Sequence, residues 1–333
     1  MTQKAGMVAR VLLVGATVWA AMAPAGAHPA GPPPVTGLVQ TLPLPADLQH
    51  LVEPVNVSAA AVAAAGCPTS IPRSTVDREP DEVEGPRVHV VYLVPSQPYD
   101  RGFDTDGSIE CSMRAMNDWM LEQSGDLTWR FDTFLHNGEH LVDVTYHKST
   151  KPYSELDGGG EVSAEIAAHF AVSNLTRYLT FVESRTGPCG DAFSGMVLDN
   201  GFFNGRFSQV YMRVPGCNGN DFGVPGNAGM AEMIAQQELL HNDALVSQVA
   251  PHACGPPGVG VGVPNLGGHV CTAAVVGYAG NLDPESVDVM FPFVGLPLRD
   301  KVLDKDHDDY YKHPFPYLRD LDDNAYFFDR AAS

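Results

Sequence analysis

The first 27 residues have the organisation of an export signal, and all six cysteines lie after it. Lys4 and Arg10 supply a positive start, residues 11–22 form an apolar run, and residues 25–27 have the Ala-x-Ala form of a cleavage site. Export carries the rest of the chain into an environment where disulfides persist. The sequence therefore predicts a signal peptide over residues 1–27 and a secreted domain that is stapled by disulfides.

The cysteines are expected to pair with one another and to leave no free thiol. Their even number and the predicted export both favour disulfides, although about fifteen pairings are open to six cysteines. Proximity in the sequence favours Cys189 with Cys217 and Cys254 with Cys271. A zinc-cysteine cluster is the alternative, but the chain contains no C-x-x-C spacing. The six disulfide candidates are Cys67, Cys111, Cys189, Cys217, Cys254 and Cys271.

The charge of the chain excludes two classes of partner. The 40 acidic residues outnumber the 20 basic ones, and no basic run occurs. Binding to nucleic acid or to an anionic membrane surface needs clustered Lys and Arg, so neither is expected. No stretch after the signal approaches the ~18 uninterrupted apolar residues of a membrane span.

The chain divides at residue 87. Residues 28–66 are rich in Pro and Ala, with three consecutive prolines at 32–34, and an acidic stretch follows at 77–84. This composition predicts a tether or pro-segment over 28–86. The β-branched apolar run at 88–94 has the character of a strand buried on both faces. The folded domain is therefore expected to cover residues 87–333.

Strand-like and helix-like patterns alternate in the first half of this domain. Strands are expected at 88–94, 127–135, 141–146, 177–183 and 209–214, and helices at 109–120 and 161–172. The second half is mostly loops. This order predicts an α+β domain of α/β-like character, with a mixed and twisted sheet and a loop-rich C-terminal half.

A further helix at residues 230–241 carries unusual polar groups. Met230, Ile234, Gln237 and His241 share one face at helical spacing, and Glu238 lies beside them. Polar groups on a buried face need partners. The Glu-x-x-His element is weak evidence alone, because roughly one is expected by chance in a chain of this length.

Three segments that follow this helix in the sequence strengthen the evidence that its Glu-x-x-His element is functional. They are Ala-Pro-His at 250–252, Gly-Gly-His-Val-Cys at 267–271 and Val-Asp-Val-Met at 287–290. In that order they resemble the zinc-binding half of a family of secreted actinobacterial metzincin-like metallopeptidases, whose pattern is H-E-x-x-H, A-P-H, G-G-H-C and a D-V-M turn under the metal. The resemblance covers most of residues 87–330.

The resemblance implies a metzincin-like fold with an active-site-type helix and a peptide or protein as substrate or ligand. It also assigns roles to individual residues. Glu238 is the candidate general base, and His241 and His252 are the candidate zinc ligands. His269 is a second-rank ligand or a partner of the ligands, and Met290 forms the apolar floor of the site. In an H-E-x-x-H helix two imidazoles one turn apart bind zinc, and the Glu takes a proton from water.

The chain departs from this pattern at three places. Gln237 stands where the family has its first zinc-binding His, and its carbonyl oxygen is a weaker zinc donor than imidazole. Residues 242–244 replace the turn that holds a Gly in metzincins. Phe291 and Pro292 stand where Cys and Tyr are expected. The resemblance therefore implies a zinc site that is weakened or lost.

An acidic stretch near the C-terminus is a separate candidate. Asp304, Asp306 and Asp308 alternate in the chain, and a turn could gather these carboxylates around Ca²⁺. A solvated loop is the alternative. The stretch lacks the Gly and the closing Glu of an EF-hand, so that motif is excluded.

Three functions are compatible with the sequence. The first is a working secreted zinc endopeptidase in which another group replaces the missing ligand. The second, which the departures favour, is an impaired or inactive homologue, a pseudoenzyme. The third is an extracellular binding or scaffold protein without a metal. Convergence of His241, His252 and Glu238 in space is expected from the first two and not from the third.

Overall fold

The computed structural model describes most of the expected domain and two segments that precede it. The described residues are 37–41, 64–78, 85–170, 173, 175–194, 206–242, 246, 250–252, 254, 269–271, 287–292, 296–316, 318 and 320–329. The predicted export signal lies outside these ranges, and so does Ala244 of the altered turn.

A six-stranded mixed sheet forms the centre of the domain, with the strand order β1-β8-β9-β7-β2-β6. Strands β6, β2, β7 and β9 are parallel, whereas β8 is antiparallel to β9 and β1 is antiparallel to β8. This arrangement confirms the predicted α+β class and the mixed sheet. The strands are β1 (Gly37–Thr41), β2 (Arg87–Val94), β6 (Val144–Lys148), β7 (Thr176–Val182), β8 (Gly190–Ser194) and β9 (Phe207–Tyr211).

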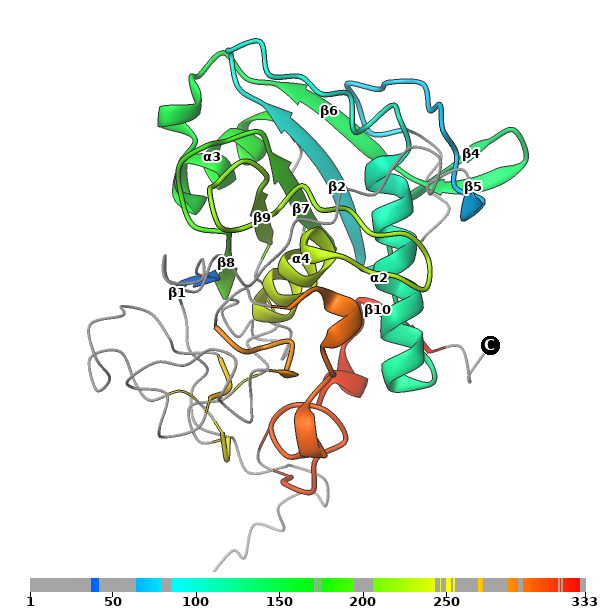
Figure 1. Cartoon of the computed structure of the whole chain (residues 1–333), viewed down its shortest axis with the longest axis vertical. Coiled ribbons are helices and arrows are strands. Elements are labelled where there is room, and N and C mark those ends of the chain that lie inside the picture. Colours follow the sequence, from blue (N-terminus) through cyan, green and yellow to red (C-terminus); the bar gives the residue numbers. More distant parts are fainter. Residues whose placement is uncertain are drawn as a thin grey trace, which may run out of the picture.

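Helices cover both faces of this sheet (Figure 1). Helices α2 (Ser108–Ser124) and α4 (Met230–Asn242) pack in one hydrophobic cluster with Val90 and Tyr92 of β2, and α3 (Gly159–His169) packs in another with Val91 and Leu93. Alternate residues of β2 thus enter different cores, which is why its sequence is apolar from Val90 to Val94. Among the described helices, none has both the length and the apolar character to cross a membrane.

The shorter elements differ from the sequence expectation. The strand expected at 127–135 is divided between two small sheets, and the one expected at 141–146 is divided at Asp143 between β5 and β6. Asn137 and Gly138 have positive φ and form the turn between β4 and β5. The remaining elements are β3 (Leu127–Trp129), β4 (Thr133–His136), β5 (Glu139–Val142), β10 (Phe327–Asp329) and the 3₁₀ turns η2 (Tyr153–Glu155), η5 (Leu298–Asp300), η6 (Lys305–His307) and η7 (Leu321–Asp323).

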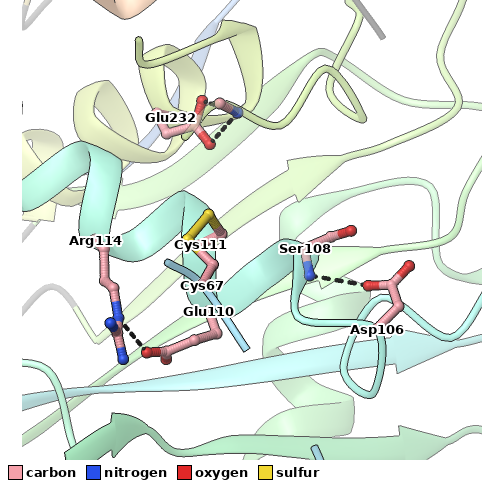
Figure 2. The surroundings of a disulfide bond; sticks show 8 residues. Cys67, Asp106, Ser108, Glu110, Cys111, Arg114 and Glu232 are labelled. Carbon is pink, nitrogen blue, oxygen red and sulfur yellow. Dashed lines mark hydrogen bonds and ion pairs between the residues drawn. A yellow bond between two sulfur atoms is a disulfide. The ribbon is translucent and has the colours of Figure 1, made fainter. Parts of the chain in front are cut away.

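All six cysteines form disulfides, and no cysteine is free. The two pairs expected from proximity, Cys189 with Cys217 and Cys254 with Cys271, are confirmed. The third joins Cys67 to Cys111. Figure 2 shows this bond at α2, beside the ion pair of Glu110 with Arg114 on the same helix.

Residues 64–78 belong to the folded unit, although we expected the domain to begin at residue 87. The Cys67–Cys111 disulfide fixes this segment to α2, and Arg73 forms an ion pair with the buried carboxylate of Asp104 at 2.7 Å. Arg78 pairs with the buried Asp143 between β5 and β6. The Pro- and Ala-rich composition gave no sign of these long-range contacts.

Candidate metal site on helix α4

Helix α4 is buried along its whole length, which is unusual for a helix with so many polar side chains. It packs against β8, β9 and α2, and each of its residues is buried. Buried polar groups cost free energy unless they are hydrogen-bonded. The polar side chains that need partners belong to Glu232, Gln236, Gln237, Glu238, His241 and Asn242.

Glu232 and Gln236 have hydrogen-bond partners in the core of the domain. The carboxylate of Glu232 accepts a hydrogen bond from the backbone N–H of Gly223 at 2.8 Å and another from Gly229. Burial raises the pKa of Glu232 to about 7. Oε1 of Gln236 accepts a hydrogen bond from the indole N–H of Trp129 at 2.7 Å. These contacts join the beginning and the middle of α4 to the core.

His241 and His269 face each other at the end of the helix. Their Nε2 atoms are 3.1 Å apart, and the two rings lie nearly perpendicular. Both side chains are buried. Burial, and then the proximity of His269, lower the pKa of His241 well below its usual value. The neutral imidazole of His241 has a nitrogen lone pair that can accept a proton or bind a cation.

A disulfide and a backbone ladder position His269. The carbonyl of His269 accepts from the N–H of Cys254 at 2.8 Å, and the N–H of Cys271 donates to the carbonyl of His252 at 2.7 Å. The Cys254–Cys271 disulfide links the same two segments. The N–H of Val270 donates to the carbonyl of Met290 at 3.1 Å. These bonds hold the His269 segment between the disulfide and the turn at residue 290.

Gln237 contacts that turn directly. Its side-chain N–H donates to the carbonyl of Phe291 at 2.6 Å, one residue after Met290. Met290 is fully buried in the same hydrophobic cluster as Ile234 of α4. Gln237 and Met290 therefore lie where α4 meets this turn. The first was predicted to be part of the metal site and the second to form its floor.

Glu238 lies against Gly190, the first residue of β8. A methyl group on Gly190 would stand 2.7 Å from Oε1 of Glu238 and 2.5 Å from a methyl of Ile234. Burial, and then the charges of Asp191 and Glu238 among others, raise the pKa of Tyr211 well above its usual value. The predicted general base is thus a buried carboxyl group at the junction of α4 with the sheet.

His252 has a different set of partners. Its Nδ1 lies 3.3 Å from Oδ1 of Asp308 and 3.3 Å from Oδ2 of Asp309. Its backbone N–H donates to Oδ1 of Asp309 at 2.9 Å. The structure therefore brings His241 together with the second-rank candidate His269, and it places His252 beside two carboxylates. Within the described residues no group of metal-ligating atoms unites His241, His252 and Glu238, so the convergence that the peptidase hypotheses expected is not found.

The three aspartates predicted to bind calcium also have different partners. The carboxylate of Asp304 accepts backbone N–H groups, among them that of Tyr310 at 2.7 Å. Asp306 pairs with Lys305 at 2.6 Å, and Asp308 faces His252. No group of converging ligands within the described residues contains all three, so calcium stays a prediction.

Two groups of side chains in the described part of the chain could each hold a metal ion. One consists of Asp77, His89 and Asp143, and the other of His252, Asp308 and Asp309. The first was missed in the sequence because its members are far apart and follow no motif. Asp309 belongs to the acidic stretch near the C-terminus, but sequence order did not link it to His252.

Comparison with known proteins gives no relative: no protein-family model, no curated protein and no solved structure matches this chain. The functional argument therefore depends on the geometry of the residues and on the sequence motifs.

Proposed function

We propose that the chain is a secreted homologue of metzincin-like zinc endopeptidases in which the zinc site is degraded, so that peptidase activity is impaired or lost. The contact between His241 and His269 is the observation that carries this proposal. Both imidazoles are buried and their Nε2 atoms are 3.1 Å apart. The three disulfides support export, because such bonds persist outside the cytosol.

The distance between the two nitrogens suits a shared zinc ion. Tetrahedral zinc with Zn–N bonds of about 2.0 to 2.1 Å places two imidazole nitrogens about 3.3 Å apart. The observed 3.1 Å is close to this value. An N–H···N hydrogen bond between neutral rings has a similar length, so the metal has to be measured. His241 and His269 are the residues that would hold zinc.

The donor set fits zinc only in part. A catalytic zinc ion normally has three protein ligands. The position one turn before His241 belongs to Gln237, and its amide group donates to the carbonyl of Phe291. The imidazole of His252 pairs with Asp308 and Asp309. Two imidazoles therefore converge where three ligands are needed, which supports weak zinc binding.

The residues of α4 have defined roles in the peptidase chemistry from which this site derives. Zinc, when bound, supplies Lewis acidity toward a peptide carbonyl. Glu238 would accept the proton of the attacking water, because it holds the Glu position of the H-E-x-x-H spacing, three residues before His241. The substrate class is peptide or protein.

Zinc analysis combined with a casein assay tests the proposal. In the unmodified protein we expect little bound zinc that is lost on replacing His269. We also expect no casein cleavage, and Glu238→Gln is the control for cleavage. Gln237→His should add about one zinc equivalent that His269→Ala removes. Tight His269-dependent zinc with Glu238-dependent cleavage in the unmodified protein would contradict the loss of activity. No gain in zinc for Gln237→His would contradict the metzincin assignment of α4.

A further inference from the structure

His252, Asp308 and Asp309 form a compact group of metal-ligating atoms. One atom from each side chain lies within 4.8 Å of the others, and the imidazole Nδ1 is 3.3 Å from each carboxylate. The Asp309 side chain is fully buried, whereas His252 is 30% and Asp308 27% exposed. The group is therefore anchored by the buried Asp309 and is accessible to solvent through His252 and Asp308.

The charges of the group do not balance. Two carboxylates face one imidazole, so the group has an excess of negative charge whether or not the ring is protonated. Oδ1 of Asp308 is shielded from solvent and accepts no hydrogen bond from the residues that the structure describes. A buried acceptor in this state costs free energy, and a cation would relieve it.

The loop that carries the two carboxylates is fixed in place. The buried carboxylate of Asp304 accepts the backbone N–H groups of Asp309 at 3.2 Å and of Tyr310 at 2.7 Å. Asp304, Asp306 and His307 all have positive φ, a region that residues other than Gly rarely adopt. The contacts of Asp304 therefore hold this loop in a conformation in which Asp308 and Asp309 face His252.

Asp309 also fixes the imidazole. Its Oδ1 accepts the backbone N–H of His252 at 2.9 Å, while its Oδ2 faces the ring. The carboxylate of Asp309 thus fixes the backbone of His252 and also faces its imidazole. Such second contacts orient ligands in metal sites.

We propose that His252, Asp308 and Asp309 bind a divalent transition-metal cation, at a site that is separate from the His241–His269 pair. One imidazole nitrogen with two carboxylate oxygens suits the divalent cations of the first transition series, from Mn²⁺ to Zn²⁺. Ca²⁺ prefers ligand sets made of oxygen alone, so the imidazole disfavours it. The inference does not depend on peptidase activity.

Metal titration of the full-length protein with Zn²⁺, Mn²⁺ and Ca²⁺ tests the inference. We expect about one tight equivalent of Zn²⁺ or Mn²⁺ and weaker binding of Ca²⁺. Asp308→Asn should weaken this site more than about tenfold, because losing even an outer partner of a ligand costs that much. Asp300→Asn is the control: Asp300 is a nearby exposed carboxylate that faces Arg299 and belongs to neither site, so binding should not change.

Variants at His269 separate this site from the one on α4. Binding that survives His269→Ala and disappears in Asp308→Asn supports the inference. Binding that disappears in His269→Ala and survives in Asp308→Asn overturns it and favours the α4 site. Equal binding in all variants, or tighter binding of Ca²⁺ than of the other two cations, also overturns it. Thermal melts without metal establish that each variant is folded.

Discussion

Gly190 and Glu238 are packed so closely that no side chain fits between them. Gly190 begins β8, and a methyl group there would lie 2.7 Å from Oε1 of Glu238. The same methyl group would lie 2.5 Å from Ile234. Both neighbours belong to α4, so this glycine sets how closely the helix approaches the sheet at β8.

Gly190→Ala should therefore destabilise the domain. Overpacking of this kind typically costs about 1 to 3 kcal/mol, and we expect a loss of that size in the free energy of unfolding. The matched control is Gly160→Ala, because Gly160 lies in α3 with no heavy atom near a new methyl group. Urea denaturation of both variants is the measurement. Equal stabilities would show that α4 and β8 separate easily.

Gln237→His should lower stability without zinc and raise it with zinc. The substitution removes the hydrogen bond to the carbonyl of Phe291, which costs about 1 kcal/mol. Zinc bound to the folded state alone then stabilises it by mass action. The control is Gln236→His, which is equally buried but bonds to Trp129. Thermal melts with and without zinc check this, and an equal response of both variants would argue against a site at position 237.

Glu232 should make the protein less stable as the pH rises. Burial raises its pKa from 4.5 to about 7, so the folded protein keeps this proton in a range where the unfolded chain has lost it. Its contribution to the free energy of unfolding therefore falls between about pH 4.5 and pH 7 and is constant above, with a total change of about 3 kcal/mol.

The variant Glu232→Gln removes this titration. We expect its stability relative to the unmodified protein to improve as the pH rises from 5 to 8. Equilibrium unfolding at several pH values measures the difference between the two proteins. A difference that does not depend on pH would mean that Glu232 titrates normally.

The Cys67–Cys111 disulfide should contribute strongly to stability. It closes a loop between residues 44 apart in the sequence, and chain entropy for a loop of that size corresponds to about 4 kcal/mol. Replacing both cysteines with serine should reduce the free energy of unfolding by an amount of this order. A loss below about 1 kcal/mol would indicate that the contacts of Arg73 and Arg78 hold the segment without the disulfide.

The elements with long apolar patterns could be predicted from the sequence. The run at 88–94 predicted β2. Met113, Met116 and Met120, which recur at helical spacing with Ile109, predicted α2, because each pattern reports burial directly. Strand β8 was missed. Its five residues include Gly190 and Asp191 and have no apolar run, and its burial depends on α4, which lies far along the chain.

The candidate site was predicted only in part for a similar reason. The spacing on α4 indicated His241 and Glu238, since a helix fixes the relation between its own residues. The choice between His252 and His269 depended on loops. The backbone ladder and the disulfide at Cys254 and Cys271 bring His269 to the helix. The imidazole of His252, from the same ladder, instead faces the carboxylates of Asp308 and Asp309. Order in the sequence does not reveal such contacts.

The attachment of residues 64–78 determines what proteolytic processing would produce. Cleavage between Arg78 and Arg87 would break the backbone but leave Cys67 bonded to Cys111. The product would be a two-chain protein, whose smaller chain separates in a denaturing gel only after reduction. Strand β1, which precedes Cys67 and pairs with β8, would stay tethered beside the helix that carries Glu238.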